Sequence, residues 1–88
     1  MIYLLEAEGQ RIEFSGMVRL QVIMFQNSLN NGDEATVYDG RNNLIFKATR
    51  QAGNDPYTAI FPFGYPAYDG LIAETLTTGY ITIWTIGT

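Results

Sequence analysis

Two copies of the tripeptide Tyr-Asp-Gly are the residues of this sequence best suited to do chemistry. They are Tyr38-Asp39-Gly40 and Tyr68-Asp69-Gly70. If the fold brings them together, the carboxylates of Asp39 and Asp69 could bind a cation or a ligand hydroxyl. The alternative is structural, because Asp-Gly commonly ends a strand, with Asp capping the turn, Gly at positive φ and Tyr packing beneath. We favour the structural interpretation.

A calcium site is a wider version of the same idea. The acidic residues expected in loops are Asp33, Glu34, Asp39, Asp55 and Asp69. Calcium requires about six to eight oxygens around one point, and no loop has the Asp-x-Asp-x-Asp-Gly run of the helix–loop–helix calcium motif. The chain also has no His and no Cys, so the usual zinc ligands are missing. The sequence predicts no metal and no cofactor.

Catalytic groups are scarce. Neither Ser15 nor Ser28 has a histidine to activate it, and acid–base chemistry would fall to Asp, Glu, Tyr or Lys47. A glycosidase-like pair of carboxylates is formally available, but nothing selects two of the nine acidic residues. No glycine-rich phosphate loop is present. We therefore expect a protein that is not an enzyme.

Composition points to a binding surface. Only 16 % of the 88 residues are charged, against 47 % hydrophobic and 14 % aromatic, and about 25 % charged is usual. A single domain of this size, residues 1–88, would expose surplus apolar area, so we expect a homo-oligomer, with a trimer favoured.

Charge and hydropathy also exclude two classes of partner. The net charge is −4, and Lys47 and Arg50 are the only cations close together, so a nucleic-acid partner is not expected. No run of about 18 apolar residues exists, and the N-terminal segment lacks a positive flank. We expect neither a membrane span nor a signal peptide.

Alternating apolar and polar residues indicate the elements that must position these groups. In 17–25, Val18, Leu20, Val22 and Met24 are expected on one face and Arg19, Gln21, Ile23 and Phe25 on the other. Asn30–Asp33 suits a tight hairpin turn. The expected strands cover 2–8, 11–14, 17–25, 35–39, 44–49, 57–61, 71–76 and 80–86. The fold class predicted is all-β, an antiparallel β-sandwich of seven or eight short strands, with the jelly roll as a candidate topology.

Three segments are candidates for contacts with other proteins. In the aromatic loop 61–68 we expect Phe61 to close the core, and Phe63 and Tyr65 to lie at an interface. Trp84, in the last strand, is expected to be a core or subunit-contact anchor. The segment 1–15 is expected to be a hairpin or arm about Gly9. Its apolar run, which forms either a core strand or an arm that adds to a neighbouring sheet, is Ile2, Tyr3, Leu4 and Leu5.

From Met17 onward, short motifs follow a characteristic order. They are Thr36-Val37-Tyr38-Asp39-Gly40, Leu44-Ile45, Ile60-Phe61-Pro62, Asp69-Gly70-Leu71-Ile72 and Gly79-Tyr80-Ile81-Thr82-Ile83. This order resembles that of small structural proteins of tailed bacteriophages, and residues 1–15 lie outside the resemblance. Such proteins look like β-sandwich modules without catalytic residues, so no site residues transfer.

The resemblance implies a virion component. The expectation is a capsid decoration (cement) protein that bridges subunits of the major capsid protein, or a head-fibre or tail-associated part. The main alternative is a carbohydrate-binding module, in which Tyr65, Tyr68 and Trp84 stack on sugar rings and Asp39 or Asp69 binds hydroxyls.

Overall fold

All regular structure in the described part of the chain is β-strand. The computed structural model describes residues 2–51 and 57–86, which form eight strands in two antiparallel sheets. The strands are β1 (Ile2–Leu5), β2 (Arg11–Ile12), β3 (Met17–Gln26), β4 (Glu34–Asp39), β5 (Leu44–Thr49), β6 (Tyr57–Tyr68), β7 (Leu71–Leu76) and β8 (Tyr80–Ile86).

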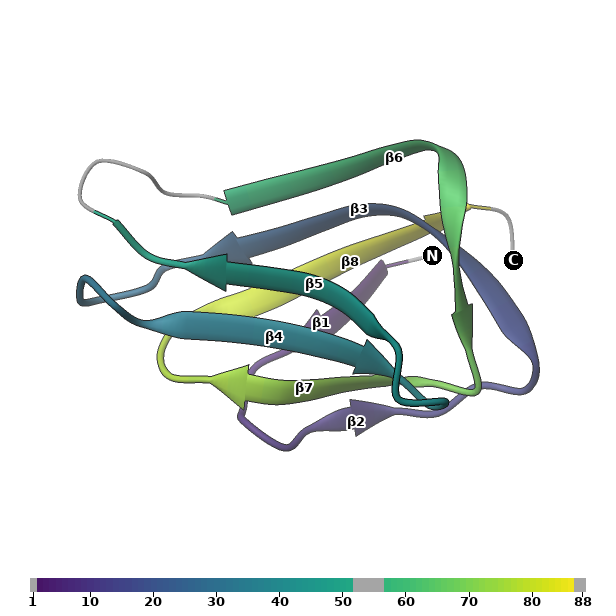
Figure 1. The fold of residues 1–88 in the computed structure, drawn as a ribbon, viewed down its shortest axis with the longest axis horizontal. Helices are drawn as coiled ribbons and strands as arrows, with labels where there is room; N and C mark the ends of the chain where they lie inside the picture. Colours follow the sequence, from purple (N-terminus) through teal and green to yellow (C-terminus); the bar gives the residue numbers. More distant parts are fainter. Residues whose placement is uncertain (1, 52–56, 87–88) are drawn as a thin grey trace.

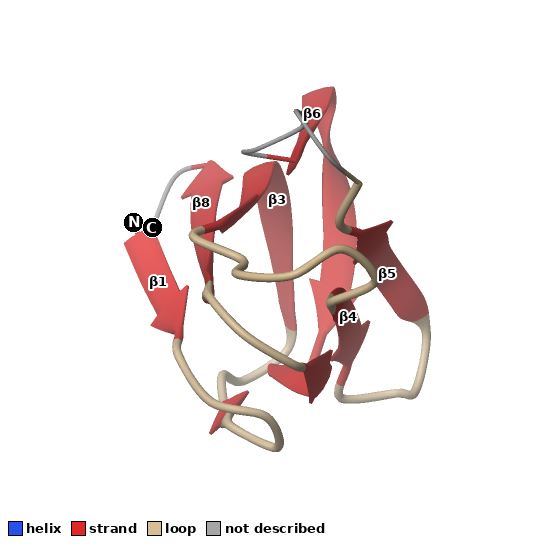
Figure 2. Ribbon diagram, turned by 90° about the vertical axis from the view of Figure 1, so that its left-hand side faces the viewer, coloured by secondary structure: helices blue, strands red, loops and turns tan. Residues whose placement is uncertain are grey.

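The strand order is that of a jelly roll. One sheet has the order β1-β8-β3-β6 and the other β2-β7-β4-β5. Among the described strands, β4 and β5 are the one consecutive pair that shares a sheet, and every other connection crosses between the sheets (Figure 1). Figure 2 shows β1, β8 and β3 in one layer, with β4 and β5 across from them. The prediction of an all-β antiparallel sandwich is confirmed, and its topology is that of the jelly roll.

Both sheets bury one face in a common core. Strand side chains alternate between faces, so each strand contributes every second residue. The first sheet contributes Leu5, Leu20, Ile23, Phe25, Ala67, Ile81 and Ile83, and the second contributes Ala35, Val37, Phe46, Leu71, Ala73 and Leu76. The expected strand 80–86 is confirmed, and it alternates, with Ile81, Ile83 and Thr85 inside.

A bulge in β3 changes the expected alternation. The pairing of β3 with β8 and with β6 shifts between Leu20 and Val22. Gln21 is therefore an extra residue, and beyond it the strand turns over by one position. Leu20, Ile23 and Phe25 are fully buried, and Val22 lies outside. The prediction that Leu20 and Val22 share a face was wrong, because strict alternation takes no account of an inserted residue.

Two expected hairpins are not formed. β1 and β2 do not pair with each other: β1 pairs with β8 in one sheet and β2 with β7 in the other, and the turn with Gly9 connects the sheets. The Asn30–Asp33 turn likewise joins β3 to β4 across the sandwich. Gly32 there has a φ of 90°, so the turn chemistry was recognised but the partner strand was not. The expected strands 44–49 and 57–61 leave 50–56 as a connection, of which 52–56 lie outside the described residues.

Candidate functional site

The outer face of the sheet β1-β8-β3-β6 has a continuous apolar row. Ile2 pairs with Trp84, Trp84 with Val22, and Val22 with Ile60. Directly paired residues point to the same side of a sheet, so these four side chains cross all four strands as one row. Ile2 and Ile60, at its ends, are 62 % and 66 % exposed, while Trp84 and Val22 are partly buried.

A second row extends this surface along the strands. Leu4 pairs with Thr82, and Thr82 with Met24. Ile86, toward the other end of β8, is also exposed. Among the outward-facing residues of the described strands β1, β3, β6 and β8, Arg19 is the only one with a charged side chain. It pairs with Ile86 at one end of this surface. We call this surface, comprising Ile2, Leu4, Val22, Met24, Ile60, Thr82, Trp84 and Ile86, the apolar face.

The outer face of the opposite sheet is different. It has three charged residues, each paired with a polar or half-buried residue of the neighbouring strand: Arg11 with Ile72, Glu34 with Thr49, and Lys47 with Thr36. Glu74 is also exposed on β7. Charges scattered among polar groups are typical of a solvated sheet face. The apolar face is therefore a property of one side of the molecule, whereas scattered single exposed hydrophobic residues need no explanation.

A bulge in β6 adjoins the apolar face. Leu20 pairs with Tyr65 and Val22 pairs with Ile60, so residues 61–64 of β6 lie opposite Gln21 alone. Figure 1 shows the sharp turn of β6 at this point. Phe63 is 92 % exposed, and Gly64 has a φ of 81°. A Cβ on Gly64 would lie 3.0 Å from Arg19 Cβ and 3.3 Å from Ile86 Cδ1, so the bulge lies against the Arg19 end of the apolar face.

The rest of the aromatic segment is anchored. Phe61 packs against the core, and its ring centroid is 5.3 Å from that of Tyr65, which is 39 % exposed. Both flanks of the bulge are paired with β3. The segment was expected to be a loop, but it is a strand interrupted by residues 61–64. Phe63 is the one strongly exposed aromatic side chain of this described segment.

The two Tyr-Asp-Gly turns do lie together, at one end of the sandwich. Asp39 is 1 % exposed, and its carboxylate accepts four hydrogen bonds. Oδ1 accepts from the backbone N–H groups of Arg41 and Asn43, both at 2.9 Å. Oδ2 accepts from Asn43 Nδ2 at 3.0 Å and from the Tyr68 N–H at 3.2 Å. The Asp39 carboxylate therefore joins its own turn to the second one.

These bonds determine the ionisation of Asp39. Burial raises the pKa of the carboxyl, but the hydrogen bonds from Asn43, Tyr68 and Arg41 outweigh burial and hold the pKa below its usual value. The carboxylate is thus ionised and its oxygens are occupied by donors. It has no free oxygen directed at a ligand.

Arg41 and Gly40, which follow Asp39 in the first turn, hold the second turn in place. Arg41 Nε donates to Asp69 Oδ2 at 3.1 Å, and the Arg41 guanidinium lies 4.5 Å from the centroid of the Tyr68 ring. The Gly40 N–H donates to the Tyr68 carbonyl at 2.7 Å, and a Cβ on Gly40 would lie 2.7 Å from the Asp69 carbonyl. This contact explains why glycine is present at position 40, and it supports the structural interpretation of both turns.

Among the described residues, the other acidic candidates do not form a cation site. Asp33 Oδ2 accepts from Thr78 Oγ1 at 2.6 Å and from the Asn30 N–H at 2.8 Å, and these bonds, with that of Thr78 first, lower its pKa. Within 2–51 and 57–86, no group of three or more His, Cys, Asp or Glu side chains is arranged to hold a metal. Asp55 lies outside the described residues.

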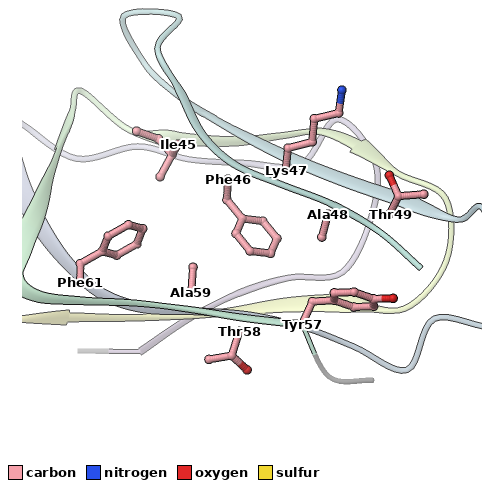
Figure 3. Close-up of a pocket in the computed structure, with 9 residues that line it drawn as sticks. All are labelled: Ile45, Phe46, Lys47, Ala48, Thr49, Tyr57, Thr58, Ala59 and Phe61. Atoms are coloured by element: carbon pink, nitrogen blue, oxygen red, sulfur yellow. The ribbon is translucent and has the colours of Figure 1, made fainter. Parts of the chain in front are cut away.

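A groove of about 540 Å³ runs between the free edges of β5 and β6. Figure 3 shows Phe46 and Ala48 of β5 pointing toward Ala59 and Phe61 of β6, with Lys47 directed away. The groove is shallow, and its described lining is mixed, with Lys47, Thr49, Tyr57 and Thr58 beside the apolar residues. Lys47 is directed away from it, and the described lining includes no carboxylate, so these residues give little support to a small-ligand site.

The predicted interface residues divide between the two faces of the first sheet. Ile2, Leu4 and Trp84 lie on the apolar face, and Phe63 is on the adjoining bulge. Leu5 is buried, and Tyr3 packs against the core, with its ring 6.3 Å from that of Phe14. The apolar run Ile2–Leu5 is thus a strand of its own chain's sheet, which is the core-strand alternative.

Val22 and Ile60 were missed by sequence reasoning. Val22 was expected to share a face with Leu20, which is buried, because the bulge at Gln21 was not foreseen. Ile60 alternates with Ala59 and Phe61, which pack against the core, so alternation in 57–61 was the signal that could have placed it outside.

Comparisons with known proteins give no relative. No protein-family model, no curated protein and no solved structure matches this chain. In the described residues no helix has the length and apolar character needed to cross a membrane.

Proposed function

We propose that this protein is a non-enzymatic structural component of a tailed-phage virion, and that it decorates the capsid by docking against the major capsid protein. The observation that supports this most directly is Phe63, an almost fully exposed ring on a firmly held bulge. An aromatic side chain in such a position is a typical anchor for a protein partner.

The local backbone suits an anchor. Pro62 and Pro66 restrict the chain on both sides of Phe63, and pairing with β3 fixes the strand before and after the bulge. A preorganised side chain loses little conformational entropy on binding. The motif order that resembles small phage structural proteins provides the setting, and the use of the Asp39 carboxylate in turn formation is consistent with a role that needs no catalyst.

The carbohydrate alternative finds less support. Its three rings have separate surroundings: Tyr68 lies beneath Arg41, Tyr65 lies beside Phe61, and Trp84 lies in the apolar row. Asp39 has its oxygens occupied by donors. A stacking platform with adjacent hydroxyl acceptors is therefore not formed by these residues.

The test is co-sedimentation of the purified protein with capsids of the phage that encodes it, using wild type, Phe63→Ser and Leu29→Ser. Leu29 is a matched control, because it is 72 % exposed in the turn between β3 and β4, at the opposite end of β3 from the bulge. We expect wild type and Leu29→Ser to bind, and Phe63→Ser to bind at least about 30-fold more weakly, as for a hot-spot residue.

Absence of binding by the wild type would contradict the proposal. Equal binding by all three proteins would contradict the role of Phe63. A shift in tryptophan fluorescence on titration with sugars, together with a failure to bind capsids, would favour the carbohydrate alternative.

A further inference from the structure

We infer that the free edge of β5 accepts an extended segment of a partner protein as an added strand. The segment has apolar side chains facing the groove between β5 and β6, and a carboxylate opposite Lys47. This contact goes beyond the proposed function, because it uses neither Phe63 nor the apolar face.

The two strands that border the groove each have one unpaired edge. Among the described strands, β5 pairs with β4 and β6 with β3, and both lie at the end of their sheets. An edge strand presents a row of backbone N–H and C=O groups that no neighbouring strand binds. A polypeptide in extended conformation carries the complementary row at the same spacing, so a strand is the occupant that this edge fits.

The hydrogen bonds of Arg50 show which way the backbone of β5 faces. The Arg50 N–H donates to the Asp33 carbonyl at 2.8 Å, and the Arg50 carbonyl accepts from the Gly32 N–H at 3.0 Å. Both backbone groups of Arg50 therefore point toward the β4 side. Backbone groups alternate along a strand, so those of Ala48 also face β4, and those of Thr49 face the free edge.

The contacts of β4 with its other neighbour agree with this direction. The Glu34 carbonyl accepts from the Thr77 N–H at 3.1 Å, on the β7 side of β4. Glu34 therefore has its backbone groups turned away from Thr49, its partner on β5. The same alternation applies to the pair of Thr36 and Lys47. Lys47 and Thr49 are thus the residues whose N–H and C=O groups are open to an added strand.

An added strand would place every second side chain in the groove. Residues opposite Phe46 and Ala48 would point inward with them, because directly paired residues share a face. On the other side of the groove they would meet Ala59 and Phe61 of β6 (Figure 3). Ala48, Ala59 and Phe61 are only partly buried, so apolar side chains of a partner would cover surface that the chain leaves open.

Lys47 determines which strand can pair. It is exposed on the outer face of β5 and directed away from the groove, so its neighbour on an added strand would lie on that same face. An opposite charge there stabilises the pair of strands, and a like charge destabilises it. A second copy of β5 that paired antiparallel about Lys47 would oppose two ammonium groups. Lysine on an edge strand thus acts against stray pairing and leaves this edge selective for an acidic segment.

Amide hydrogen exchange of the free protein, followed by NMR, tests the direction of the backbone groups. We expect the N–H groups of Lys47 and Thr49 to exchange quickly. Those of Phe46 and Ala48 should exchange at least about tenfold more slowly, because β4 binds them. Equal protection of all four N–H groups would overturn the inference.

The binding probe is the capped nonapeptide acetyl-Ser-Val-Thr-Val-Glu-Val-Thr-Val-Ser-amide. Its central Glu can pair with Lys47 while the valines on either side face the groove. We expect saturable binding at millimolar or lower concentration, with the largest amide shifts and newly slowed exchange at Lys47 and Thr49. The same peptide with Lys at its centre should bind at least about threefold more weakly.

Substitution of Lys47 should reverse this preference. Lys47→Glu changes an exposed side chain, and this variant should bind the Lys-centred peptide at least about threefold more tightly than the Glu-centred one. Arg11→Glu is the matched control, since Arg11 is an exposed cation on β2, at the other edge of the same sheet, and it should keep the wild-type preference. Phe63→Ser should also bind like wild type, which separates this test from that of capsid docking.

N-methylated peptides test the backbone contact itself. The N–H of the central Glu would face Lys47, so methylation of that nitrogen should weaken binding at least about tenfold. The N–H of the valine that follows would point away from β5, so methylation there should change the affinity by less than about twofold.

No binding of the Glu-centred peptide at millimolar concentration, amide shifts confined to another edge, or equal loss from both methylations would each overturn the inference. Equal affinity of wild type for both peptides, or an unchanged preference in Lys47→Glu, would overturn the acidic partner. Protection of Lys47 and Thr49 that rises with protein concentration in the absence of peptide would place a second copy on the edge and overturn the inference as well.

Discussion

At the scale of single residues, Asp39 is the polar side chain on which one end of the sandwich depends. Its carboxylate accepts four hydrogen bonds from two turns, although burial alone would favour the neutral form. Asp69, its counterpart in the second turn, forms an exposed ion pair with Arg41. The two aspartates of one sequence motif thus make very different contributions to stability.

Substitution of these two residues tests this difference. Asp39→Asn replaces an acceptor oxygen by an amide that faces N–H donors, so we expect a loss of about 2–4 kcal/mol in the free energy of unfolding. Asp69→Asn keeps a residue that tolerates the φ of 63° found there and should cost less than about 1 kcal/mol. Urea unfolding at neutral pH measures both, and equal effects would contradict the assigned role of Asp39.

The pH dependence of stability follows from the lowered pKa values of Asp33 and Asp39. A carboxyl whose pKa is lower in the folded state stabilises the protein fully above its unfolded value of about 4. That contribution is lost as the pH falls through the lower folded pKa. We expect the urea midpoint to fall between about pH 5 and about pH 2, and to fall less in Asp39→Asn. An equally steep fall in that variant would contradict the prediction.

At the scale of elements, β3 shows what a sequence pattern can and cannot predict. The bounds of β5, β7 and β8 follow from alternation between turn residues, because the residue types within and beside each strand are enough to predict where it begins and ends. The bulge at Gln21 depends on pairing with both β8 and β6, which is information from distant parts of the chain. The crossing of the Asn30–Asp33 turn between sheets depends on the same kind of information.

The candidate site was predictable to a similar extent. Phe63, Ile2 and Trp84 were recognised from their aromatic or terminal positions. The row to which Ile2 and Trp84 belong also requires Val22 and Ile60. Those two residues become neighbours of Trp84 only through strand order. A single sequence indicates which residues of a strand share a face, whereas the order of strands in a jelly roll depends on the whole fold.

Paired substitutions test the corrected register of β3. Ile23 is fully buried, so Ile23→Ala should reduce the free energy of unfolding by about 2–4 kcal/mol. Val22 lies on the outer face, so Val22→Ala should cost about 1 kcal/mol or less. Urea unfolding of both variants is the measurement. A larger loss of unfolding free energy in Val22→Ala than in Ile23→Ala would favour strict alternation along β3 and contradict the bulge.

At the scale of the whole molecule, the apolar and the charged surfaces lie on different sides. One sheet exposes the apolar face and the Phe63 bulge, and the other has Arg11, Lys47 and the half-buried Glu34 on its outer face. A small domain with this asymmetry has one side suited to neighbours and one suited to water. That division, rather than any pocket, is the basis of the proposed decoration role.

Electron cryomicroscopy of capsids from the encoding phage, incubated with the purified protein, tests the central claim most directly. The proposal predicts β-sandwich density at repeated positions on the shell, with the β6 bulge against the major capsid protein. A shell that remains bare at saturating protein concentration, or density in which the bulge faces solvent, would contradict it.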